Sequence, residues 1–337
     1  MKAKGSFAQI RQSIVDQKIM QDLDFRHLNF DHFDLAGAHF IHCMFDGCVF
    51  KKSDLSKTFF SECSMTNAQF SDNYYRSAQL VKCLLDSSQW HGEVKKLNFS
   101  DCSVKASVWN QVTLTFCAFS LGDLSNAQFN YCQWLTVSLT KLIMNDTEFQ
   151  HNQFIKVSWM DTDFSTLMLK HCEFERVLLL QCDLSGLDFS NLKFHFCTCN
   201  GNRLVKTNFY GATVSNCSFS NSELESVDFR QAKLMKSLFT KSVLKNCQFD
   251  GGDLDNSKFT DAHLQDCSLI GCDLTQSIFK QANMSKVNFS HSQLAYANLS
   301  YAQLSQCIFN HVQLNSTNIH SLKEDKCQWK GVKNQVF

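Results

Sequence analysis

The sequence predicts an all-β solenoid built from a five-residue repeat, and three observations indicate it. A large apolar residue falls at every fifth position along most of the chain. A small or aliphatic residue stands two positions before it, and the other three positions are mostly polar. The 337 residues include no proline, as expected where nearly every backbone N–H donates to a sheet. A period of five fits neither a helix nor an alternating strand, but it fits a square coil with one pentapeptide per side.

The central apolar column sets the register of these units. It runs from Phe25 to Trp90, slips by one residue, restarts at Phe99 and continues to Ile319. This makes about 59 pentapeptides, and 25 of the 31 phenylalanines are centres. Consecutive units such as FDGGD and LDNSK repeat the same order of side chains. Such a chain buries its core between neighbouring units and need not divide into ordinary globular domains.

This pattern resembles that of the pentapeptide-repeat family. The family pattern is a small residue, a polar one, a central Leu or Phe and two polar residues, as in ANLSYAQLS and GCDLTQSIF. The resemblance covers about residues 20–320 and implies a right-handed quadrilateral parallel β-helix with four pentapeptides per coil, hence about 15 coils. It is specific for the fold and says little about function.

The N-terminal residues 1–20 are expected to form a helical cap over the first coil. Ser6 suits a helix N-cap, and Phe7, Ile10 and Ile14 would share one helical face. A cap of this kind would cover open strand edges and apolar core. A recognition segment is the alternative.

Residues 21–320 form the predicted β-helix. At the C-terminal end, residues 321–337 are expected to form a cap or a tail. Trp329 and Phe337 could plug that end of the core. Within the β-helix, the frame slip falls at residues 91–98. Either Val94 is the centre of a four-residue unit, or extra residues bulge as a loop at His91, Gly92 and Glu93. Because loops on a rigid scaffold often carry function, the loop would be a candidate contact point.

Most cysteines belong to the small inward column, and we interpret them as core residues. Residues twenty apart should stack, so Cys43, Cys63 and Cys83 should form a ladder. A disulfide framework or metal site is the alternative, but no CxxC pair has zinc spacing and free Cys behaves as a small buried hydrophobe. We therefore expect no metal and no cofactor. The column holds fifteen of the 17 cysteines, namely Cys43, Cys48, Cys63, Cys83, Cys102, Cys117, Cys132, Cys172, Cys182, Cys197, Cys217, Cys247, Cys267, Cys272 and Cys307.

Composition argues against several classes of function. The chain has 32 basic and 32 acidic residues without a charge run, so we expect neither nucleic-acid nor membrane binding. No GxSxG, HExxH or P-loop motif occurs, so we expect no catalytic residues and no enzyme. The N-terminus lacks the apolar stretch of a secretory signal, which indicates a bacterial cytoplasmic protein, although translocation into a target cell is left open.

Outward-facing apolar residues are the candidate binding site, because outer positions should be polar. Leu135 and Ile155 follow a centre and lie twenty apart, so they should stack on one side. Met160, Leu178 and Leu180 fall on the next side and could complete a patch around one corner. A contiguous patch of this kind often marks a protein interface. Scattered surface apolars, or a bulge that turns them inward, are the alternatives.

The function predicted from these features is a non-enzymatic bacterial protein-interaction scaffold. Its partner would be a protein of unknown identity or a second copy of the chain. The family resemblance allows a secreted effector or a secretion-system accessory protein. It also implies an alternative, a DNA-mimicking topoisomerase-binding protein of the quinolone-resistance type. Those proteins depend on a strongly acidic surface, whereas the net charge here is zero.

Overall fold

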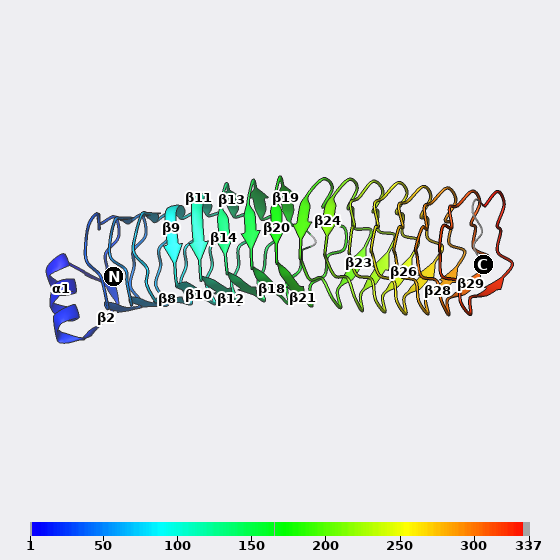
Figure 1. The fold of residues 1–337 in the computed structure, drawn as a ribbon. Coiled ribbons are helices and arrows are strands. Elements are labelled where there is room, and N and C mark those ends of the chain that lie inside the picture. Colours follow the sequence, from blue (N-terminus) through cyan, green and yellow to red (C-terminus); the bar gives the residue numbers. More distant parts are fainter. Residues whose placement is uncertain (1, 165, 333–337) are drawn as a thin grey trace. The chain divides into compact units, whose positions relative to one another are not determined.

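The structure is a computed structural model that describes residues 2–164 and 166–332. In this part of the chain nearly all regular structure is parallel β, stacked as a solenoid of about 16 turns, with one short helix. The predicted β-helix is therefore confirmed. The chain divides into two compact units, Met1–Cys172 and Glu173–Phe337, each of which is a stack of coils (Figure 1).

The first unit contains the helix α1 (Phe7–Asp16) and strands β1 to β19. Most strands have three residues, with the central side chain buried and its neighbours facing outward, because one pentapeptide spans each side of the coil. Its strands are β1 (Ala3–Lys4), β2 (Ile19–Gln21), β3 (Leu23–Asp24), β4 (His39–Ile41), β5 (Val49–Lys51), β6 (Phe59–Ser61), β7 (Gln69–Ser71), β8 (Ala78–Val81), β9 (Gln89–Lys95), β10 (Leu97–Ser100), β11 (Val108–Thr115), β12 (Ala118–Ser120), β13 (Gln128–Asn130), β14 (Gln133–Leu135), β15 (Ser138–Thr140), β16 (Glu148–Gln150), β17 (Gln153–Ile155), β18 (Ser158–Met160) and β19 (Met168–Lys170).

The second unit repeats the same architecture with strands β20 to β30. Seven of them, β23 and β25 to β30, follow one another in a single parallel sheet. The strands of this unit are β20 (Glu173–Glu175), β21 (Leu178–Leu180), β22 (Lys193–His195), β23 (Arg203–Val205), β24 (Thr213–Ser215), β25 (Glu223–Glu225), β26 (Val243–Lys245), β27 (His263–Gln265), β28 (Asn283–Ser285), β29 (Gln303–Ser305) and β30 (Lys323–Asp325).

Residues twenty apart are paired in both units, as the five-residue period predicts for a four-sided coil. Phe40 is paired with Phe60, and Leu224 with Leu244. The corner after each side is turned by one residue in the left-handed region, such as Lys57 at φ 56°. Asn, Asp and Gly tolerate this conformation best, which explains why polar and small residues recur there.

The frame slip at residues 91–98 is a shortened unit, and the loop alternative is wrong. His91, Gly92 and Glu93 lie inside strand β9, and Val94 is fully buried as the centre of a four-residue side. The coil is consequently one residue short, so Leu97 is paired with Ala78, nineteen positions earlier.

The next coil restores the period of twenty at β11. The register between β9 and β11 shifts after Asn110, where Gln111 has no counterpart in β9. Gln111 occupies the left-handed region at φ 52° and turns a corner between Asn110 and Val112. Strand β9 has no extra residue at this corner, because His91 is followed directly by Gly92.

The core consists of stacked apolar columns, one above each side of the coil. One column of the first unit carries aromatic rings in successive coils: Phe50 and Phe70 have ring centroids 5.0 Å apart, and Trp90 and Trp109 4.4 Å apart with planes only 1° apart. All of these side chains are buried. Offset stacking of this kind stabilises beyond simple burial of area.

The small inward column is held by hydrogen bonds to the coil before it. Ser53 donates from its hydroxyl to the carbonyl of Phe30 at 2.7 Å, and the Cys63 thiol lies 3.6 Å from the carbonyl of Phe40. The predicted ladder of Cys43, Cys63 and Cys83 is longer than expected, because the nineteen-residue coil places Cys102 against Cys83. The sequence spacing of twenty does not predict this neighbour, because Cys102 lies nineteen residues after Cys83.

The N-terminal helix lies beside the first coils (Figure 1). Ser6 is its N-cap, as predicted, and the structure adds a reciprocal capping box between Ser6 and Gln9. The ring of Phe7 packs edge-on against Phe30 at 5.2 Å, and Ile10 is fully buried. The helix thus covers apolar core that the first coil would otherwise expose.

The C-terminal segment continues the coil as far as it is described. Strand β30 pairs with β29, and Trp329 stacks on Phe309 with ring centroids 4.1 Å apart. Trp329 therefore covers the last phenylalanine of its column. Phe337, the other predicted plug, lies outside the described residues.

Candidate functional site

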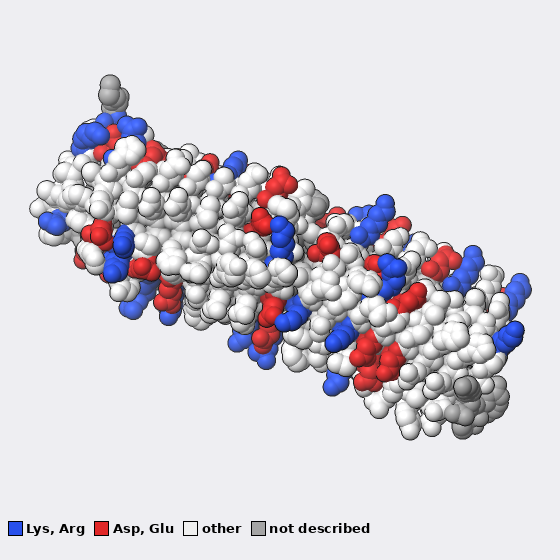
Figure 2. All heavy atoms as spheres, turned by 90° about the horizontal axis from the view of Figure 1, so that it is seen from above, with Lys and Arg blue, Asp and Glu red and all other residues white. Residues whose placement is uncertain are grey.

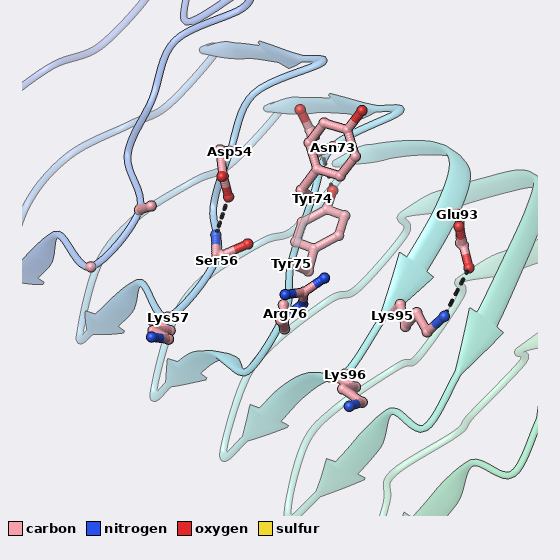
Figure 3. Close-up of a pocket in the computed structure, with 12 residues that line it drawn as sticks. Asp54, Ser56, Lys57, Asn73, Tyr74, Tyr75, Arg76, Glu93, Lys95 and Lys96 are labelled. Atoms are coloured by element: carbon pink, nitrogen blue, oxygen red, sulfur yellow. Dashed lines mark hydrogen bonds and ion pairs between the residues drawn. The ribbon is translucent and has the colours of Figure 1, made fainter.

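A concave region of about 920 Å³ lies on the outer face of the first unit (Figure 3). The small residues Ala36, Gly37 and Ser56 are part of its lining, and so is Tyr74, which has 67% of its surface exposed. The hollow lies where the small outward residues Ala36, Gly37 and Ser56 precede the larger Tyr74, Arg76 and Lys95 of the next two coils. We call this region, with the basic side chains described below, the basic groove.

The wall below Tyr74 is fixed by buried polar contacts. The Asn73 amide nitrogen donates to the carbonyl of Phe50 at 2.8 Å, and its oxygen accepts from the backbone N–H of Ser53 at 2.8 Å. The same amide nitrogen lies 3.2 Å from the Tyr75 hydroxyl, and burial raises the pKa of that phenol. The groove therefore has a rigid wall, as preorganised binding requires.

Cations outnumber carboxylates in the basic groove. Lys57, Arg76 and Lys96 are exposed and form no ion pair within the described ranges. Figure 3 shows these three side chains on successive coils. Lys95 instead pairs with Glu93 at 4.0 Å. The other carboxylate, Asp54, accepts the backbone N–H of Ser56 at 2.8 Å, so its charge is partly satisfied locally.

An apolar corner, defined as Phe116, Leu135 and Ile155, adjoins the groove on the same sheet face. Lys95 of β9 is paired with Thr115 of β11, Thr115 with Leu135 of β14, and Leu135 with Ile155 of β17. Leu135 and Ile155 are half-buried, whereas Phe116 is 53% exposed. The basic and apolar side chains thus lie in a row along one edge of the sheet, with Thr115 between Lys95 and Leu135 and with the exposed Lys156 directly after Ile155.

Phe116 stands at an unfavourable position for its residue type. It turns a corner in the left-handed region at φ 55°, which disfavours bulky side chains, and its ring faces solvent. Its backbone N–H donates to the carbonyl of Leu135 at 3.1 Å, which joins it to the next coil. An aromatic residue that has both an unfavourable backbone conformation and a solvent-exposed ring is a candidate functional residue.

The predicted five-residue patch divides between the two units. Leu135 and Ile155 stack as expected. Met160 is 38% exposed but lies at the far end of β18, beyond Ser158 and the buried Trp159. It therefore does not adjoin the apolar corner.

Leu178 and Leu180 belong to the second unit. They are half-buried in β21, on either side of buried Leu179, and Leu178 is bridged to Thr198. The patch of all five residues stays a prediction. His91, also a predicted site residue, points its ring outward from β9, and its Nδ1 donates to the carbonyl of Asn110 at 2.9 Å.

No metal ligand set is found in the described ranges. No group of three or more His, Cys, Asp or Glu side chains there is placed to hold a metal ion. Burial raises the pKa of the thiols at Cys48, Cys132 and Cys172 to about 12, which keeps them protonated and unreactive at neutral pH. Nor is any helix of residues 2–164 or 166–332 long and apolar enough to cross a bilayer.

Sequence reasoning missed Phe116 and the basic groove. Phe116 is one of the six phenylalanines outside the centre column, and this frame violation was a usable signal. Nothing comparable identified the groove, because Lys57, Arg76 and Lys96 are spaced nineteen or twenty apart and look like ordinary polar outer residues. Only the stacked coils bring them together.

Comparison with known proteins matches the repeats to two family models. The description "Pentapeptide repeats (8 copies)" matches residues 19–56, 43–72, 203–240 and 222–261, and "Pentapeptide repeat region" matches residues 242–319. Together these ranges cover just over half of the chain. A search of curated proteins returned no match.

Several solved structures show local similarity. A pentapeptide repeat protein of the Arabidopsis thaliana thylakoid lumen is 24% identical over 28% of this chain and 66% of its own, with a TM-score of 0.28. QnrB1, a plasmid-mediated fluoroquinolone resistance protein, is 18% identical over 72% of this chain and 82% of its own, with a TM-score of 0.24. HetL, which is involved in heterocyst differentiation regulation in Nostoc sp. PCC 7120, is 15% identical over 90% and 97%, with a TM-score of 0.19.

Proposed function

Because this chain belongs to the pentapeptide-repeat family, whose members are generally structural or interaction scaffolds, we propose that it is a non-enzymatic scaffold that binds a protein partner at the apolar corner. The partner is a foreign protein, and a second copy of the chain is the alternative. An effector or secretion-accessory role would be one use of such a scaffold.

The observation that carries this proposal is the exposure of Phe116 beside Leu135 and Ile155. An aromatic ring that is 53% exposed and held by a left-handed backbone has little freedom to withdraw from solvent. Aromatic and aliphatic side chains of this kind serve as interface anchors, because burying them against a partner removes apolar area at small entropic cost. The neighbouring leucine and isoleucine extend the anchor across three coils.

The DNA-mimic alternative has less support. A surface that imitates a duplex needs a field of one sign, whereas the chain carries 32 basic and 32 acidic residues. On the face drawn in Figure 2, blue and red side chains lie beside one another with uncharged surface between them. We therefore favour protein recognition by a local site over mimicry of a whole duplex.

Affinity capture from the source cells with two variants tests the proposal. Phe116→Asn combined with Ile155→Lys removes the apolar corner, and Asn suits the left-handed backbone at position 116. Leu121→Asn is the matched control, since Leu121 is 58% exposed at φ 58° on a different corner of the same unit. We expect a protein recovered by wild type and the control to be lost from the double variant, whose circular dichroism stays unchanged. The same captured proteins from all three chains would refute the proposal.

A further inference from the structure

We infer that the partner segment bound by this scaffold is acidic at one end and apolar at the other, and that its acidic end lies in the basic groove. This inference rests on the proposed function and specifies the partner's chemistry. It follows from the position of the groove beside the apolar corner, from the unpaired cations and from the dimensions of the row.

The row has the length of a short linear segment. Five coil steps separate the coil of Lys57 from that of Ile155, and strands in adjacent coils are about 4.8 Å apart, so the row spans about 24 Å. An extended peptide advances about 3.3 Å per residue, so about seven residues would reach from one end to the other. The segment therefore fits within the first unit alone.

The groove end is suited to carboxylates. Lys57, Arg76 and Lys96 have no carboxylate partner in the described chain, so an incoming anion displaces no existing ion pair. Arg76 can hold a carboxylate with two parallel N–H donors. The exposed Tyr74 offers a hydroxyl and a ring face to the same segment.

A protein segment fits this surface better than a nucleic acid does. Asp54 and Glu93 also line the groove, and a nucleic-acid backbone, which carries a charge on every nucleotide, would bring phosphates next to them. A peptide can instead place its few carboxylates beside Lys57, Arg76 and Lys96.

Phe116 follows Lys96 one coil later and Leu135 follows Lys95 two coils later, so apolar side chains separate the groove cations from Lys156, the next exposed cation at this corner. A nucleic-acid site instead extends its basic track along the backbone. The change from cations to apolar side chains instead matches a segment in which acidic and apolar residues are segregated.

Fluorescence polarisation with labelled synthetic peptides of about eight residues tests the inference. The first peptide carries aspartates in one half and Leu and Phe in the other. The second replaces the aspartates with asparagines, and the third replaces the apolar residues with serines. A short DNA duplex is the fourth probe. The full-length chain is compared with Arg76→Glu/Lys96→Glu, and with the control Lys236→Glu/Lys241→Glu, which reverses two exposed corner lysines of the second unit.

We expect the segregated acidic peptide to bind about tenfold more tightly than its asparagine counterpart, and salt to remove this difference. Arg76→Glu/Lys96→Glu should lose the same factor, and the control variant should lose nothing. Equal binding of the acidic and asparagine peptides, with loss on Phe116→Asn, would overturn the acidic inference and leave the proposed function standing. Tighter binding of the duplex than of every peptide, or no peptide binding at about 1 mM, would overturn the inference as well.

Discussion

Replacement of Phe229 by alanine should destabilise the second unit by roughly 3–5 kcal/mol. The ring is fully buried and stacks between Phe209 and Phe249, with centroids 5.0 and 4.9 Å away. A buried phenylalanine removes about 150–250 Å² from water, and at about 25 cal/mol per Å² this corresponds to about 4–6 kcal/mol as an upper bound. Alanine retains a small part of that burial, and the coil cannot close over the cavity because backbone pairing fixes its width.

Guanidinium denaturation followed by circular dichroism and tryptophan fluorescence would measure this loss. The control is Phe229→Leu, which keeps most of the volume and should cost less than about 1.5 kcal/mol. Repeat proteins can unfold in parts, so both probes must be recorded before a single free energy is assigned. A loss below about 1 kcal/mol for Phe229→Ala, with coincident probes, would refute the stacked-core reasoning.

Three further predictions concern the short coil, the thiols and an ion pair. Gly92→Ala should cost about 1–3 kcal/mol, because Gly92 has φ +87° and its new Cβ would displace the Asp72 carboxylate and lie 3.2 Å from the Asp72 backbone nitrogen. Gly271→Ala, at φ +66° in open space, is the control for backbone strain alone, and equal losses in denaturation would contradict the crowding at Asp72. Thiol titration at pH 8 should find only half-buried Cys327 reacting quickly and all 17 thiols after denaturation; several fast native thiols would contradict the buried column. The Arg26 guanidinium, 2.9 Å from Asp24, lowers the pKa of that carboxyl, so the stability it contributes is present above about pH 3.9 and lost as pH falls through the folded pKa; Asp24→Asn should flatten this acid dependence, and an unchanged profile would refute it.

The repeat itself could be predicted from the sequence because the same five-residue pattern recurs in every coil. A centre such as Phe229 and the aliphatic Val227 two positions before it are both buried, as the two-column pattern requires. The slip was located correctly as well. The sequence could not decide between a four-residue side and a loop, since both shift the five-residue frame in the same way. The pairing of β9 with β11 decides it, because Gly92 lets the shorter strand pass close to Asp72 of the coil before.

The candidate site was only partly predictable for a related reason. Leu135 and Ile155 were found from spacing alone, because both follow a centre and lie in one frame. Phe116 turns a corner, where the five-residue pattern does not distinguish an exposed apolar side chain from an ordinary polar one. Lys96 lies nineteen residues after Ser77 and twenty before Phe116, so the row becomes visible only when the short coil is counted correctly.

Site-specific photo-crosslinking tests most directly whether the apolar corner contacts a partner. Phe116→p-benzoylphenylalanine places a reactive aromatic group at the corner, and the same replacement at Leu121 and at Tyr296 provides exposed controls in each unit. Irradiation of source-cell extract containing each chain should yield one crosslinked protein with the label at position 116. The controls should yield none, and prior addition of the segregated acidic peptide should reduce the product. The same crosslinks from all three positions, or none at position 116 with strong products at a control, would contradict the account.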